Sequence, residues 1–126
     1  MYSNLHIYRE SETAVTSFPH VSSGVQVVGG NPLSPLFAHV HIKAAATASS
    51  TSTVTVNVVH SDDNSTWAVC TSGAAFTFTM TSTAKELVRS IEFMSTKPYT
   101  AIQITVSGGT DPTLKYNAFQ ALERLV

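Results

Sequence analysis

The sequence predicts an all-β protein, an antiparallel β-sandwich of jelly-roll or immunoglobulin-like kind with about eight to ten strands. Short stretches of alternating apolar and polar residues recur about every ten residues, with turn-forming residues between them. There is no long helical stretch to supply parallel crossovers. The 126 residues suffice for one domain, so residues 1–126 are expected to form a single sandwich, with 1–9 as a possible N-terminal arm.

The first third of the chain predicts short strands around an irregular loop. Residues 4–9 alternate weakly and suit either an edge strand or an arm that crosses to a neighbouring subunit. Residues 12–18 and 22–28 are the next expected strands. Glycines and prolines in 29–36 then force a surface loop.

Residues 37–44 form a strongly predicted strand. The even-numbered residues Ala38–Ala44 are apolar and should face the core, while the odd-numbered residues Phe37–Lys43 should face outward. The small residues of 44–53 are expected to end this strand in a loop.

A β-hairpin is predicted over residues 51–70. Valines alternate with polar residues up to Val58, a polar cluster His60–Thr66 provides the turn, and a second apolar run begins at Trp67. We interpret Trp67 as a core anchor just after the turn.

The remainder predicts strands at 74–80, 86–94, 99–106 and 113–126. Residues 86–94 also fit helical spacing, but the strong strands on both sides favour a strand. In the last segment the alternation slips at Ala118-Phe119, which predicts a β-bulge there; its final half could instead be helical by propensity.

Composition excludes several function classes. Hydrophobic residues make up 43% of the chain and charged residues only 12%, with a net charge of −1, so Ser, Thr, Asn and Gly must cover most of the surface. Basic residues are scattered singly along the sequence, which argues against nucleic acid as a partner. Apolar runs are too short for a membrane span and no signal peptide is recognisable, so we expect a protein made in the cytoplasm without a membrane partner. The single cysteine, Cys70, excludes an intramolecular disulfide.

The strongest metal-binding candidate is the pair His39 and His41. Two histidines two apart on a strand share a face and could ligate one ion, with His60 as a possible third ligand. This spacing occurs in cupins, but the glutamate expected after the second histidine is absent, so no metal or other cofactor is predicted. The alternative is a surface or interface pair that makes assembly sensitive to pH.

Other polar clusters have simpler explanations. Residues 62–66 offer oxygen ligands of the kind calcium prefers, but turn chemistry explains the same residues. The carboxylates are dispersed, and neither double glycine leads into a helix N-terminus. The sequence therefore does not predict an enzyme.

The hairpin resembles small virion proteins of tailed bacteriophages. In those proteins a strand ending in V-x-H-S-D-D turns through a Gly/Asn/Ser/Thr tip into a strand that contains an aromatic residue. The matching residues here are Val58, His60, Ser61, Asp62, Asp63 and Trp67. The resemblance covers residues 50–110 and implies a β-sandwich from a capsid decoration (cement), tail or fibre part.

A protein resembling the decoration class would bind the major capsid protein after shell assembly, commonly as a homotrimer, and would be located in the virion. The residues that we expect at this assembly interface lie in the arm and the 29–36 loop: Leu5, Ile7, Tyr8, Asn31, Pro32, Leu33, Pro35 and Leu36. The alternative is a carbohydrate- or receptor-binding module of a tail or fibre, with Trp67, Tyr99 and Tyr116 stacking on sugars. A tail-tube or head–tail adaptor ring subunit is a third interpretation.

Overall fold

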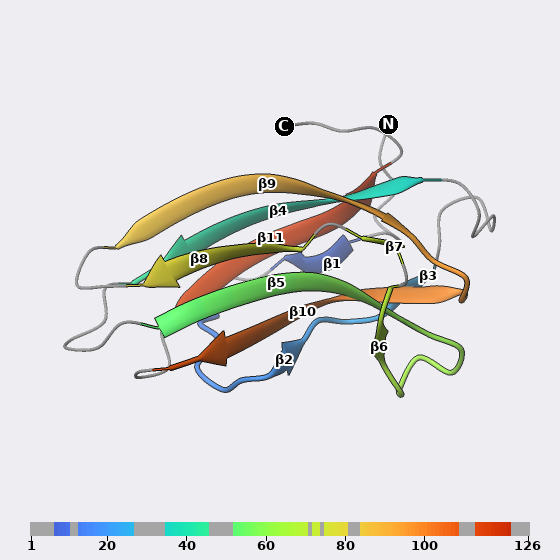
Figure 1. The fold of residues 1–126 in the computed structure, drawn as a ribbon, viewed down its shortest axis with the longest axis horizontal. Helices are drawn as coiled ribbons and strands as arrows, with labels where there is room; N and C mark the ends of the chain where they lie inside the picture. Colours follow the sequence, from blue (N-terminus) through green and yellow to red (C-terminus); the bar gives the residue numbers. More distant parts are fainter. Residues whose placement is uncertain are drawn as a thin grey trace.

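The computed structural model describes residues 7–10, 13–26, 35–45, 52–70, 72–73, 75–80, 84–108 and 113–121. Every regular segment in these ranges is a β-strand, and the strands form two antiparallel sheets packed face to face (Figure 1). The predicted all-β sandwich is confirmed. The described residues contain no helix of the length and apolarity needed to cross a membrane.

Sheet A has five strands. In spatial order they are β1 (Ile7–Glu10), β11 (Leu114–Ala121), β4 (Leu36–Ala44), β9 (Lys85–Met94) and β7 (Ser72–Gly73). Sheet B is built around β10 (Tyr99–Ser107) and β5 (Ser52–Ser61), which pair along their whole lengths. The shorter strands of sheet B are β2 (His20–Val21) and β3 (Val25–Gln26) beside β10, and β6 (Ala68–Val69) and β8 (Phe76–Met80) beside β5.

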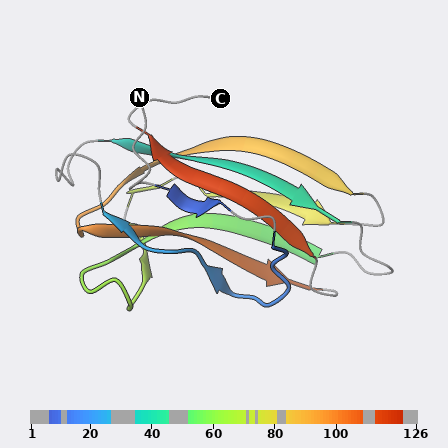
Figure 2. The same cartoon turned by 180° about the vertical axis from the view of Figure 1, so that it is seen from behind.

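The strand order is that of a jelly roll. The chain passes from β1 in sheet A to β2 and β3 in sheet B, back to β4 and over to β5, and β9, β10 and β11 also alternate between the sheets. Figure 2 shows β1, β2 and β3 along one side of the sandwich, where the N-terminal part of the chain crosses from one sheet to the other. Of the two predicted architectures, the jelly roll is therefore the one observed.

Side-chain alternation explains why these segments are strands. In β4 the residues from Leu36 to Ala44 with even numbers are buried and those with odd numbers are partly or fully exposed, as predicted. The ambiguous segment 86–94 is strand β9, and Ile91 and Phe93 are its buried residues. Helical spacing in this segment is overridden because β4 pairs with it in continuous register.

Two local expectations are wrong. The bulge predicted at Ala118-Phe119 is absent, since β11 pairs with β4 in unbroken register and Gln120 continues the buried alternation. The irregularity lies in the neighbouring strand instead, where Tyr8 is the extra residue between Ile7 and Arg9. The strand expected over 12–18 is reduced to a single bridge in the described residues, between Val15 and Leu114.

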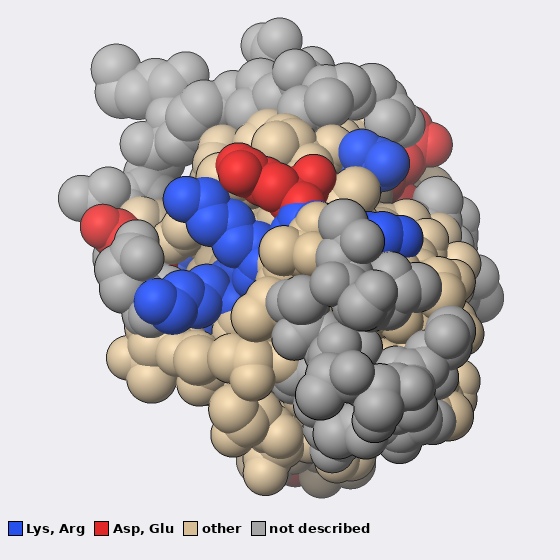
Figure 3. Space-filling view, turned by 90° about the vertical axis from the view of Figure 1, so that its left-hand side faces the viewer, with Lys and Arg blue, Asp and Glu red and all other residues tan. Residues whose placement is uncertain are grey.

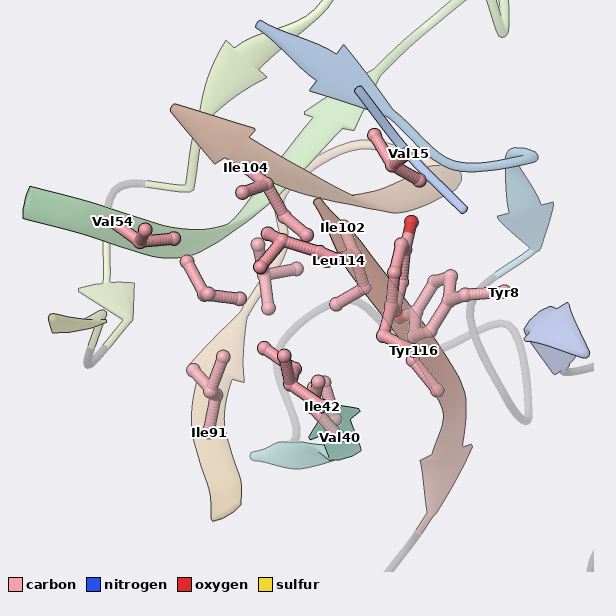
Figure 4. Packing of buried hydrophobic residues seen from close by; sticks show 14 of the residues in the cluster. Tyr8, Val15, Val40, Ile42, Val54, Ile91, Ile102, Ile104, Leu114 and Tyr116 are labelled. Atoms are coloured by element: carbon pink, nitrogen blue, oxygen red, sulfur yellow. The ribbon is translucent and has the colours of Figure 1, made fainter. Parts of the chain in front are cut away.

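The core lies between the sheets and consists mainly of branched aliphatic residues, with Phe78, Phe93, Met80 and two tyrosines among its larger side chains (Figure 4). Tyr8 and Tyr116 are only 2% and 1% exposed, and each hydroxyl has a polar partner. The Tyr8 hydroxyl lies 2.7 Å from Thr100 Oγ1, and Gln120 Nε2 donates to both oxygens at 3.0 Å. Because Thr100 belongs to sheet B, this buried group ties the two sheets together.

Candidate interaction face

The outer face of sheet A carries a row of side chains that runs across four strands. Phe119 of β11 lies opposite Ile7 of β1 on one side and His39 of β4 on the other, and Ser90 of β9 lies opposite His39. All four are half-exposed. We call this surface, with the neighbouring outward residues of the same strands, the sheet A face.

His39 is held against an aromatic ring. Its ring centroid lies 5.0 Å from that of Phe119 at a tilt of 35°. Burial lowers the pKa of His39, and the nearby His41 lowers it further, so the imidazole is neutral at neutral pH. Its Nδ1 is buried and has no hydrogen-bond partner in the part of the chain that the structure describes.

His41 lies on the same face but has a different partner. Its Nε2 is 2.8 Å from Oε2 of Glu86, which comes from β9. That hydrogen bond is the main reason that the pKa of Glu86 is below its usual range. The predicted histidine pair is thus divided, with one ring packed on Phe119 and the other paired with a carboxylate.

The third histidine is in the other sheet. His60 of β5 is 4% exposed, and its Nδ1 lies 3.1 Å from Ser95 Oγ, which donates to the carbonyl of Lys97 at 2.7 Å. It therefore stabilises the connection between β9 and β10. The three candidate ligands do not converge, and no group of three His, Cys, Asp or Glu side chains suited to a metal occurs among the described residues.

The predicted assembly residues divide into two groups. Ile7 is half-exposed on the sheet A face, and Pro35 is exposed just before β4. Tyr8 and Leu36, in contrast, are buried in the core, so their side chains serve the fold rather than an outer contact. The other predicted contacts lie outside the described residues: Leu5, Asn31, Pro32 and Leu33.

The three predicted stacking aromatics do not share a surface either. Tyr116 is buried, with its hydroxyl 2.7 Å from His20 Nε2 and the Arg9 guanidinium 5.1 Å from its ring centroid. Tyr99 and Trp67 are half-exposed. Trp67 is not among the side chains that form or cover the core, so the anchor role predicted for it is wrong.

The polar cluster after β5 is a self-contained turn. Asp63 accepts hydrogen bonds from Ser61 Oγ at 2.8 Å, from Ser65 N at 3.0 Å and from Thr66 N at 2.9 Å. These bonds, the one from the Thr66 amide first, lower the pKa of the Asp63 carboxyl. Asn64 adopts a left-handed backbone with φ of 60°. The turn explanation for these residues is confirmed, because the carboxylate is fully used within the turn.

Sequence alternation placed Phe37 outward but indicated no contact for it, and it did not identify Val88 and Phe119 as surface residues. All three are partly exposed and, by strand alternation, lie on the sheet A face. They come from three strands that are far apart in sequence. Alternation within one segment indicates only which of its own side chains share a face. The strand order β11-β4-β9 is what brings these three residues onto one surface.

Comparison with known proteins identifies a family for this chain. The family model described as Bbp16 matches residues 20–119, a span that includes every long strand of both sheets except the last residues of β11. No curated protein and no solved structure matches the chain. Because the match extends over most of its length, the chain belongs to the Bbp16 family.

Proposed function

We propose that this protein is a non-enzymatic capsid decoration (cement) protein, which binds the assembled head of a tailed bacteriophage and stabilises it. Its partner is the major capsid protein, and its location is the virion. The resemblance of the 50–110 region to small virion proteins supports this class. The observation that carries the proposal is the contrast between the two outer faces of the sandwich.

The outer face of sheet B is polar and uncharged over β8 and the facing parts of β5 and β10, whereas its other end carries Val69 of β6, which lies opposite Val59 and is 57% exposed. Thr77, Thr55 and Thr105 form one row across β8, β5 and β10, and Thr79 and Thr53 begin the next. Burying such a face removes little apolar area from water, so it offers little driving force for association. It suits a surface that stays in contact with solvent.

The sheet A face combines an apolar patch with charged residues at one end. Ile7, Phe37, Val88 and Phe119 place half-exposed apolar side chains on it, and Pro35 is exposed at its edge. Aromatic side chains on a firm sheet supply contact area at low conformational cost. We therefore assign capsid binding to this face.

Copy number explains how a modest contact could stabilise a shell. A stable interface buries about 800 Å² on each partner. Apolar burial contributes roughly 25 cal/mol per Å², and the costs of association cancel much of that gain. The binding free energy that remains is multiplied because the contact repeats over many sites. An oligomer of this chain, which we expect to be a trimer, would also engage several sites at once.

The test is binding to purified heads of the source phage that were assembled without this protein. Val88→Asp places a charge on the sheet A face, and Thr105→Asp places the same charge at a half-exposed position on the sheet B face. We expect Val88→Asp to reduce head occupancy at least about ten-fold, as hot-spot substitutions do, and Thr105→Asp to bind as wild type. Equal binding by both variants would reject the assigned face, and absence of wild-type binding would reject the decoration function.

One observation favours a second candidate, a carbohydrate-binding module. Tyr99 pairs with Ser61, and the hairpin that starts at Ser61 returns through Trp67. Both aromatic side chains are half-exposed, so they remain available for stacking, whereas Tyr116 does not. Quenching of Trp67 fluorescence by host cell-wall polysaccharide, with no binding to heads, would favour this candidate over decoration.

A further inference from the structure

Two lysines from adjacent strands lie opposite each other on the outer face at one end of sheet A. Lys115 of β11 faces Lys43 of β4, whereas Lys85 of β9, at the same end, lies opposite the buried Ala44 and so on the other side of the sheet. Figure 3 looks onto this end of the sandwich, where Lys and Arg side chains gather beside acidic ones. We call Lys43 and Lys115 the lysine cluster; with Lys85, they are three of the seven Lys and Arg residues in the chain.

Glu86 offsets only part of the charge of the cluster, because its lowered pKa is due mainly to the hydrogen bond with His41 and Lys43 contributes less. The cross-strand neighbour of Lys43 on its other side is Glu86, whose carboxylate is hydrogen-bonded to His41 at 2.8 Å. The other ion pair in the described part of the chain joins Lys97, which follows the opposite end of β9, to Asp62, which follows β5. Lys43 and Lys115 are exposed and Lys85 is half-exposed.

This arrangement works against the stability of the monomer. Side chains directly opposite in an antiparallel pair have Cβ atoms about 5 Å apart, and like charges at that separation are unfavourable. The outward position of both lysines keeps them hydrated, which limits this cost but gives the fold no benefit. A partner with opposite charge would turn the same repulsion into attraction.

We propose that the lysine cluster docks a carboxylate-rich protein surface on the partner that covers the sheet A face. Lys43 and Lys115 project from the same face as Phe119 and Val88. Phe119 lies four residues after Lys115 in β11, and Val88 of β9 lies opposite His41, two residues before Lys43. A single partner could therefore contact both regions. Apolar burial then provides affinity, and the lysines set orientation and association rate. That the partner is a capsid shell rests on the proposed function; its acidic character rests on the cluster.

The chemistry favours carboxylates over nucleic-acid phosphates. Glu86 lies within the cluster and would repel a continuous run of phosphates. The cluster has no arginine to bind a phosphate through two hydrogen bonds, and the chain as a whole has a net charge of −1. Isolated ammonium groups on a strand surface instead match separate carboxylates on a protein.

The first test adds a hexaglutamate peptide, or a DNA duplex of equal total charge, to the full-length protein. Binding is measured through changes in the amide NMR shifts of the protein. We expect the peptide to shift amides at positions 43 and 115. The Lys43→Gln/Lys115→Gln variant should weaken binding about three- to ten-fold, the effect of two exposed charge pairs, and about 0.5 M salt should suppress it. Lys97→Gln, at a different ion pair, is the matched control and should bind as wild type.

Three results would overturn the inference: no peptide-induced shifts at these positions, equal affinity of the double variant, or tighter binding of the duplex than of the peptide. A charge reversal guards against loss by unfolding. Lys115→Glu would face Lys43 as an opposite charge, so its melting temperature should not fall while peptide binding is lost.

The second test uses the phage heads described above. If wild type binds heads and the double lysine variant binds equally well, the lysine inference fails and decoration stands. If wild type does not bind heads, the proposed function fails, and the peptide experiment still decides whether the cluster recognises carboxylates.

Discussion

Gly24 sits where the hairpin turn folds back onto the sandwich, and we expect any side chain there to displace that turn. A methyl group at Gly24 would overlap the carboxamide of Asn64 and lie 2.9 Å from Cη2 of Trp67. Real non-bonded carbon atoms stay about 3.5–4.0 Å apart. Gly24→Ala should therefore push away the tip of the turn and the indole ring together.

The size of the effect follows from which groups can yield. Overpacking costs typically about 1–3 kcal/mol. The Asn64 side chain is exposed and can rotate into water, whereas the rigid indole of Trp67 has less freedom, so we expect about 1–2 kcal/mol for Gly24→Ala. Asn64→Gly should be nearly neutral alone, because the left-handed φ of 60° suits glycine. In the double variant the overlap with the carboxamide is removed, so a coupling of about 1 kcal/mol should appear.

The assay is urea denaturation of wild type, both single variants and the double variant, with a fluorescence spectrum of each native state. Trp67 is the single tryptophan, so its emission reports directly on this contact. Gly24→Ala should shift the emission to longer wavelength, and Asn64→Gly should partly restore both emission and stability in the double variant. A Gly24→Ala protein with wild-type stability and emission, or additive effects in the cycle, would refute the reasoning.

Other predictions concern buried polar groups. Burial lowers the pKa of His20 and His60 below the value of about 6.5 that histidines have in the unfolded chain, so below that pH the unfolded chain binds more protons than the folded one. Denaturation at several pH values should show full stability above about pH 6.5 and a loss as the pH decreases through the folded pKa values. The loss should be smaller in His60→Gln. Burial raises the pKa of Cys70 to about 12, so a thiol reagent at pH 8 should label the folded protein far more slowly than the urea-unfolded chain. Tyr116→Phe leaves His20 without its 2.7 Å partner and should cost about 1 kcal/mol, measured by the same denaturation.

Alternation within a strand was enough to predict most of the fold. The segment 37–44 shows this, since each residue's orientation followed from whether its neighbours were apolar, and β4 has that pattern. The bulge failed because the sequence of 113–126 was considered without its neighbours. Gln120 looks like an outward residue, but Tyr8 and Thr100 satisfy its amide inside the core, so the alternation never had to slip.

Tyr8 illustrates a further limit of local patterns. In a chain terminus, a tyrosine between a half-exposed isoleucine and an arginine has no local sign of burial. It is buried because the irregular pairing of β1 with β11 turns it inward, where two partners from distant strands satisfy its hydroxyl. Burial of that kind depends on tertiary pairing, and a residue predicted at an outer contact became part of the core.

The interaction surface was harder to predict than the fold, for a related reason. Lys43 and Lys115 are each isolated in sequence, and their spacing alone argued against any positive cluster. Their proximity arises because β11, β4 and β9 are adjacent in a jelly roll and run antiparallel, which places the end of one beside the beginnings of the other two. The same adjacency assembles Phe119, His39 and Ser90 into one row. In a protein with so few charges, the order of strands decides where charge gathers, so the surface available to a partner is a property of topology more than of any motif.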